Sequence, residues 1–264
     1  MAGELNNQYS LTKILGLWAA AALPMALLSW VVIPALAPDF AANPLGSAVT
    51  RLVWMTAGLA WQFVLAMIMV YIEEGDLRWT TITGRLRLNT PRAPKTGEPG
   101  GRLWLWLIPF LLAVALVDVA LGGVLVDLWV SVFPFFEAPP GFDAGEALGS
   151  PAVQVQLANA WWFLGLFGVF AVFNTFLGEE LLFRGILLPR MRGAFGGWDW
   201  VANGLLFGFY HLSQPWGILS SCITGLLYAY PARRFRSTWM AVILHSAQSV
   251  FFVFLIFGIV LGLA

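Results

Sequence analysis

The stretch FLGEELLFRG, residues 176–185, places two adjacent glutamates and an arginine inside a long apolar segment. Its neighbours on both sides are mostly Leu, Phe, Trp and Gly. A carboxylate at membrane depth costs about 3 kcal/mol even on the mildest scales, so it is rarely found there without a partner and a function. Glu179 and Glu180 therefore mark a candidate site, and the apolar segment around them predicts the fold.

The composition of the whole chain agrees with this segment. Of its 264 residues, 59% are hydrophobic and only 11% are charged, whereas about a quarter of an ordinary soluble domain is charged. We therefore predict a polytopic, all-α transmembrane helix bundle that forms one integral membrane domain over residues 1–264. The formal net charge of zero lacks the basic signal of a protein that binds nucleic acid. Membrane lipids are the expected surroundings.

Seven segments are candidates for spanning helices, since a span needs about 20 mostly apolar residues. Two of them are short and are separated only by Ser213-Gln214-Pro215, so the count could also be six or eight. Ala35-Leu36-Ala37 resembles a signal-peptidase site, but Pro38 follows it and the apolar run before it is too long, so we expect a retained first helix. The seven segments are 14–36, 52–72, 103–126, 158–189, 198–213, 216–231 and 239–262.

The loop charges predict an orientation. Segment 73–102 carries six Lys and Arg residues, whereas segment 127–157 carries none and has four acidic residues. Two further basic turns lie at 190–192 and 233–236. Because Lys and Arg favour cytosolic loops, we expect these turns and the N-terminus in the cytosol. We expect the protein to be a multi-pass protein of the cell membrane. Only Arg51 falls on the opposite side.

Rare polar residues of three helices lie at similar depths. Glu179 is thirteen residues from Arg192, in a basic turn, and His211 is thirteen residues from Trp198, which is expected at the same membrane boundary. Each separation corresponds to about 20 Å along a helix. His245 lies about 13 Å and Ser249 about 19 Å from the basic turn before them. We therefore expect these groups to form one site that opens to the cytosol.

Local spacing divides the two glutamates between two tasks. Glu180 and Arg184 are four residues apart with the acid first, the favourable order for a helical ion pair. In apolar surroundings each partner requires the other, because removal of one leaves an uncompensated charge. We therefore expect a structural pair of Glu180 with Arg184, and Glu179 as the carboxylate available for chemistry. Phe207 shares a helical face with His211.

Three motifs carry a family resemblance. Glu179-Glu180-Leu-Leu-Phe-Arg184 fits EExxxR, residues 207–211 fit FxxxH, and residues 245–249 resemble HxxxN. In their order, spacing and apolar setting they resemble the CPBP family, which comprises type II CAAX prenyl endopeptidases and bacteriocin-processing enzymes. The resemblance covers about residues 174–250, within a motif-bearing core of about 158–262.

The resemblance implies an intramembrane endopeptidase that cuts a membrane-associated peptide or lipidated protein, either prenylated and CAAX-like or a leader peptide. It implies that Glu179 and His211 activate water and that His245 and position 249 stabilise the oxyanion. Ser249 departs from the motif, because a hydroxyl replaces the amide of Asn and reaches less far. Loss of one oxyanion donor lowers the rate about 100- to 1000-fold in other enzymes.

Several alternatives stay open. We expect no cofactor, but Glu179, His211 and His245 also supply three ligands, the number found in catalytic zinc sites; no HExxH pair accompanies them. Ser249 leaves room for a catalytically inactive member that acts as a membrane scaffold. A proton-coupled transporter could use Glu179 and Asp118, although the chain lacks the internal symmetry typical of transporters. Cys222 is interpreted as a small buried residue.

Overall fold

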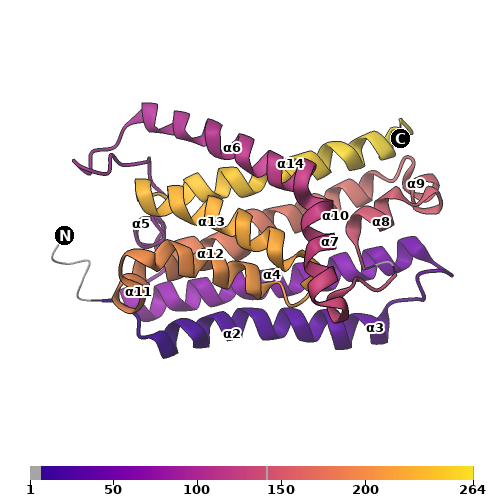
Figure 1. Ribbon diagram of the computed structural model, residues 1–264, viewed down its shortest axis with the longest axis horizontal. Coiled ribbons are helices and arrows are strands. Elements are labelled where there is room, and N and C mark those ends of the chain that lie inside the picture. Colours follow the sequence, from indigo (N-terminus) through magenta and orange to yellow (C-terminus); the bar gives the residue numbers. More distant parts are fainter. Residues whose placement is uncertain (1–6, 141, 264) are drawn as a thin grey trace.

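The computed structural model describes residues 7–140 and 142–263, and these are helical apart from turns, loops and one isolated bridge between Arg92 and Pro99. The long helices lie side by side along the longest axis of the molecule (Figure 1). The all-α prediction is therefore confirmed. Residues 1–6, 141 and 264 of the expected 1–264 domain lie outside the described residues.

Five helical stretches of the described chain are long and apolar enough to cross a membrane. They correspond to five of the seven expected segments, with ends shifted by up to eight residues. Three are interrupted by turns of π- or 3-10 helix. The stretches are Leu11–Leu36 (α2 Leu11–Leu27, η1 Leu28–Val32, α3 Ile33–Leu36), α4 Pro44–Glu74, Gly101–Val132 (η2 Gly101–Trp106, α6 Leu107–Ala115, η3 Leu116–Leu121, α7 Gly122–Val132), Trp161–Arg190, and α14 Thr238–Val260.

Four short helices in the connections were not expected from the sequence. The first follows α4, two lie between α7 and the stretch Trp161–Arg190, and the last follows that stretch. They are α5 Trp79–Arg85, α8 Ala144–Gly149, α9 Pro151–Leu157 and α11 Arg192–Phe195.

The two remaining expected segments form a tight helical hairpin. α12 (Asp199–Tyr210) has 12 residues and α13 (Ile218–Phe235) contains several hydroxyl residues and two arginines, so neither is among the five apolar spans. The helices touch through glycines: a Cβ on Gly208 would clash with Cys222, and one on Gly225 would lie 2.6 Å from the carbonyl oxygen of Gly204. Small residues let backbones approach closely, and this approach fixes the position of His211, the residue after α12.

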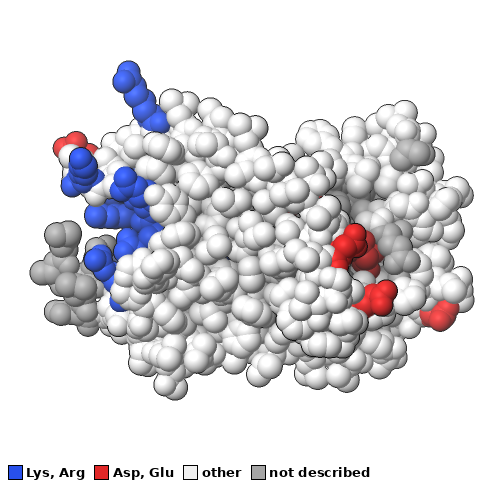
Figure 2. All heavy atoms as spheres, viewed as in Figure 1, with Lys and Arg blue, Asp and Glu red and all other residues white. Residues whose placement is uncertain are grey.

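Charge separates the two ends of the molecule. Lys and Arg gather at the end that carries α5 and α11, whereas the other end of the face in Figure 2 shows acidic residues and no Lys or Arg (Figures 1 and 2). We call these the basic end and the acidic end. At the basic end Arg85 donates to Glu73 at 2.7 Å and to the carbonyl oxygen of Gly185 at 2.9 Å, and Tyr9 donates its hydroxyl to Glu73. This network ties α4 and α5 to the stretch Trp161–Arg190.

Candidate active site

The two glutamates lie between two π-helical segments. The stretch Trp161–Arg190 begins as α10 (Trp161–Val172), continues as η5 (Phe173–Gly178) and η6 (Leu181–Leu187), and ends as η7 (Leu188–Arg190). Glu179 and Glu180 fill the gap between η5 and η6. π-Helical turns are rare and occur mostly at functional sites. The local backbone therefore marks the same residues as the sequence does.

Gly178 brings α4 against this part of the helix. A Cβ at this position would lie 2.8 Å from the carbonyl oxygen of Leu59 and 2.6 Å from that of Phe173. Contacts this short are not tolerated, so only glycine permits the approach. The close contact sets α4 beside Glu179.

Glu180, Arg184 and His245 form a fully buried cluster. Arg184 donates through Nη1 to Oε1 of Glu180 at 2.9 Å, and Nδ1 of His245 contacts the same oxygen at 3.0 Å. Arg184 also donates through Nη2 to the carbonyl oxygen of Gly225 at 3.2 Å, and its guanidinium lies 4.1 Å from the centre of the Phe207 ring. The cluster thereby joins the motif-bearing helix to α12, α13 and α14.

Glu179 is separate from that cluster. Its side chain is 3% exposed, and its Oε2 lies 3.9 Å from Nε2 of His245, beyond hydrogen-bonding distance. Tyr210 lines the cavity together with Glu179, and Gln62 donates to the Tyr210 hydroxyl oxygen at 2.5 Å. Within the described chain, Oε2 of Glu179 has no hydrogen-bond partner. This buried carboxylate oxygen is therefore available to a bound molecule.

Tyr210 and Gln62 are site residues that the sequence analysis missed. Gln62 is completely buried in the apolar middle of α4, residues 57–72. A lone amide in such a segment is itself a signal of a polar partner in the bundle. Tyr210 carries no comparable signal, because a tyrosine beside a histidine is ordinary.

His211 has a defined tautomer. Its Nδ1 lies 2.9 Å from the carbonyl oxygen of Phe207. Because a carbonyl oxygen can only accept, Nδ1 carries the hydrogen, and Nε2 of the neutral ring is an acceptor. The Phe207 ring contacts both histidine rings, with centroids 4.9 Å from His211 and 5.7 Å from His245. Phe207 therefore separates the histidines and holds His211 at its turn.

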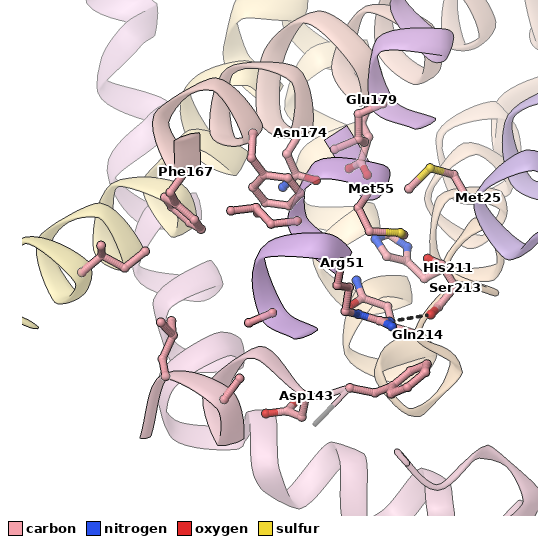
Figure 3. Close-up of a pocket in the computed structure, with 18 of the residues that line it drawn as sticks. Met25, Arg51, Met55, Asp143, Phe167, Asn174, Glu179, His211, Ser213 and Gln214 are labelled. Carbon is pink, nitrogen blue, oxygen red and sulfur yellow. Dashed lines mark hydrogen bonds between the residues drawn. The ribbon is translucent and has the colours of Figure 1, made fainter. Parts of the chain in front are cut away.

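A cavity of about 170 Å³ lies in front of Glu179. Its polar wall near Glu179 consists of Asn174, Tyr210 and His211, and Figure 3 shows Asn174, Glu179 and His211 around the same space. The cavity continues along α4 through Met55 to Arg51. Its other walls are largely apolar and include Phe163, Phe167, Phe170, Leu52, Leu59 and Ile256.

Two of the four expected catalytic residues face this cavity and two do not. Glu179 and His211 line it, whereas His245 and Ser249 are absent from its lining. His245 reaches Glu179 and Glu180 from behind. Ser249 is buried on α14, four residues after His245. It makes no hydrogen bond to the described side chains of the site.

The direction of the cavity differs from one expectation. The lining runs from Glu179 to Arg51, Phe142 and Asp143 at the acidic end, and no residue of the basic turns at 73–102, 190–192 or 233–236 belongs to it. The opening was expected towards the basic end, and the lining does not extend there. Helical rise gave the depth of the polar groups but not the side on which helices diverge. On the basic side, buried residues such as Phe183 and Leu187 fill the space between helices.

Asn174 also faces the cavity, and the motifs in the sequence did not indicate it. It lies five residues before Glu179, in η5. In a π-helix the hydrogen bonds run from i to i+5, so residues five apart fall on nearly the same face. The usual α-helical spacing would separate them, which explains why the sequence did not indicate this neighbour.

Among the described residues, no group of three or more His, Cys, Asp and Glu side chains is arranged to hold a metal ion. In the set Glu179, His211 and His245, Nδ1 of the two histidines contacts Phe207 and Glu180 respectively. Nε2 of each ring is therefore the nitrogen that could bind a metal.

Comparison with known proteins gives one family. No curated protein and no solved structure matches the chain. The family model described as Type II CAAX prenyl endopeptidase Rce1-like matches residues 159–251. This segment begins just before α10, ends in α14 and contains all three motifs. The match confirms the resemblance drawn from those motifs: over residues 159–251 this integral membrane protein is similar to the Rce1-like type II CAAX prenyl endopeptidases.

Proposed function

We propose that the protein is an intramembrane endopeptidase that hydrolyses a peptide bond of a membrane-associated substrate. One observation carries this proposal: Glu179, Tyr210 and His211, which all belong to the Rce1-like segment, line one largely apolar cavity. Peptide hydrolysis needs an activated water, a donor for the oxyanion and a proton for the leaving amine. The residues around the cavity can supply each of these.

Glu179 is the proposed base. Water between Glu179 and Nε2 of His211 transfers a proton to the carboxylate as its oxygen attacks the substrate carbonyl. Tyr210, held by Gln62, orients the carboxylate. When the carbon–nitrogen bond breaks, Glu179 returns the proton to the leaving amine. The Glu180–Arg184–His245 cluster positions Glu179 because Glu180 is the adjacent residue.

The oxyanion donor is assigned to Asn174. The resemblance pointed to His245 and Ser249, but the amides that line the cavity are Asn174 and Gln214. Gln214 follows Ser213, the contact of Arg51, whereas Asn174 is on the same helical stretch as Glu179. An amide N–H there can donate to the developing oxyanion. His245 then acts from behind, where it stabilises the charged carboxylates, and Ser249 serves packing. This assignment supports activity in spite of the serine in the third motif.

The two alternative functions fit the cavity less well. A proton-coupled transporter would need Asp118 near Glu179, yet Asp118 lies in η3 and does not line the cavity. An inactive scaffold needs no carboxylate in a cavity, whereas Glu179 lines this one and its Oε2 is buried without a hydrogen-bond partner among the described residues.

The basic end is proposed to face the cytosol, because Lys and Arg favour that side, so the cavity opens on the opposite face. With Cys222 replaced by serine, a cysteine introduced at Ser150 should react with a membrane-impermeant maleimide in intact cells. A cysteine introduced at Thr96 should react only after the cells are opened. The reverse pattern would invert the orientation.

Glu179→Gln should lower kcat by about 100- to 10,000-fold, because a general base contributes that much. The assay follows cleavage of a prenylated CAAX peptide and a panel of leader peptides in liposomes, with Glu137→Gln as the matched exposed control. Equal cleavage by Glu179→Gln and the parent would refute the assignment. Repeating the assay on metal-free protein with a chelator tests the zinc alternative, and loss of activity restored by zinc would support that alternative.

Asn174→Ala should lower kcat by about 100- to 1000-fold, the usual cost of one oxyanion donor, with little change in KM. Ser249→Ala should have a much smaller effect, because Ser249 does not line the cavity. Steady-state kinetics of both variants decide between them. A larger loss of kcat in Ser249→Ala than in Asn174→Ala would show that Ser249, in the third motif, is the oxyanion donor.

Arg184→Ala should destabilise the protein by about 3–5 kcal/mol, because it leaves Glu180 buried without its partner. The expected observations are a low folding yield and a lower midpoint of thermal unfolding in detergent. Arg192→Ala removes an exposed arginine nearby and serves as the control. A normal midpoint for Arg184→Ala would show that the pair is not structural.

A further inference from the structure

Arg51 occupies an unusual place for a cation. Of the fourteen Lys and Arg residues of the chain, Arg184 is buried with Glu180 and the others except Arg51 belong to the basic end. Arg51 lies near the beginning of α4, in the wall of the cavity. A cation is disfavoured in apolar surroundings. An unfavourable placement of this kind indicates a partner or a function.

The contacts of Arg51 leave part of its guanidinium available. Nη2 donates to Oγ of Ser29 at 3.1 Å and to the carbonyl oxygen of Ser213 at 3.3 Å, and the group lies 4.2 Å from the centre of the Phe142 ring. Nη1 is buried and has no hydrogen-bond partner among the described residues. Asp143 supplies an opposing charge from the same wall of the cavity. Ser29 and Ser213 thus fix Nη2 of the guanidinium, whereas Nη1 has no acceptor among the described residues.

The position of Arg51 relative to Glu179 can be measured along two paths. Leu59 touches Gly178, and Arg51 precedes Leu59 by eight residues on α4, which corresponds to about 12 Å. By the second path, Arg51 bonds to Ser213, which is two residues from His211 and therefore at most about 7 Å away between α carbons. An extended peptide advances about 3.4 Å per residue. Two to four substrate residues therefore fit between the water site and Arg51.

We propose that Arg51 binds a carboxylate of the substrate, two to four residues beyond the bond that Glu179 cuts. Arginine presents planar pairs of N–H donors that match a carboxylate, and Figure 3 shows Arg51 in the cavity below Glu179. The carboxylate can be the C-terminal group of the substrate or an Asp or Glu side chain. Arg51 then selects substrates with an anion at this distance. This inference rests on the proposed function for the direction of the substrate.

Binding can be tested without turnover. In the Glu179→Gln background, Kd is measured in detergent for a membrane-anchored peptide with a free C-terminal acid and for the same peptide as its C-terminal amide. The free acid should bind about 10- to 100-fold more tightly, as expected for charge-assisted hydrogen bonds. A third peptide, amidated but ending in Asp, distinguishes the two sources: tight binding of this peptide shows that a side-chain carboxylate is accepted.

Variants of Arg51 should change the ratio of the two Kd values. In Arg51→Gln the ratio of the amide Kd to the acid Kd should fall towards 1, whereas Arg51→Lys should retain part of it, because lysine keeps the charge but loses the planar pair of donors. Arg192→Gln should keep the full ratio. Equal Kd values for acid and amide in the Glu179→Gln protein would overturn the proposal, even if Arg51→Gln failed to fold.

Cleavage gives an independent measure on active protein. Mass spectrometry should show release of a fragment of two to four residues from the free-acid peptide, and extending the tail should move the cut by the same number of residues. A cut that stays in place would also overturn the role of Arg51. If acid-selective binding holds and no peptide is cut, the proposed protease function fails while the carboxylate site stands.

Discussion

The buried ion pair of Arg184 with Glu180 is the interaction on which the rest of the site depends. Both side chains are fully buried, and the desolvation of two such charges is offset only by good geometry and further hydrogen bonds. His245 and the carbonyl oxygen of Gly225 supply those further contacts. The motif-bearing helix, α13 and α14 must therefore meet at this point. The position of Glu179 is fixed by the same contacts, because Glu179 is adjacent to Glu180 in the chain.

The π-helical turns change which residues of the motif-bearing helix face the cavity, compared with a regular α-helix. η5 places Asn174 on the face of Glu179, and Gly178 lets α4 approach the same level. α4 then forms one wall of the cavity, with Gln62 near Tyr210 and Arg51 farther along. The catalytic wall and the proposed specificity residue are thus placed by one helix contact.

The sequence analysis predicted much of this molecule for identifiable reasons. Length and apolar composition indicated five spans that the structure contains, and the i to i+4 spacing indicated the contact of Glu180 with Arg184. The missed residues depend on packing between helices without motifs. Gln62 belongs to α4, and Tyr210 meets it only because the α12–α13 hairpin packs tightly. The residues that line the cavity could not be predicted in the same way, because depth along a helix does not reveal where helices separate.

The apolar composition of the chain is sufficient to predict a helical membrane protein. Its rare polar groups, on three helices at similar depths, predict a shared site, because burial of charge in an apolar chain is too unfavourable to occur without partners. Which of those groups face a cavity is known from the packing of the helices alone. That packing placed Glu179 and His211 in the wall, His245 behind them and Arg51 at the acidic end. The reason is physical: spacing along one helix sets depth and face, whereas a cavity arises from the distances between helices that side-chain packing sets.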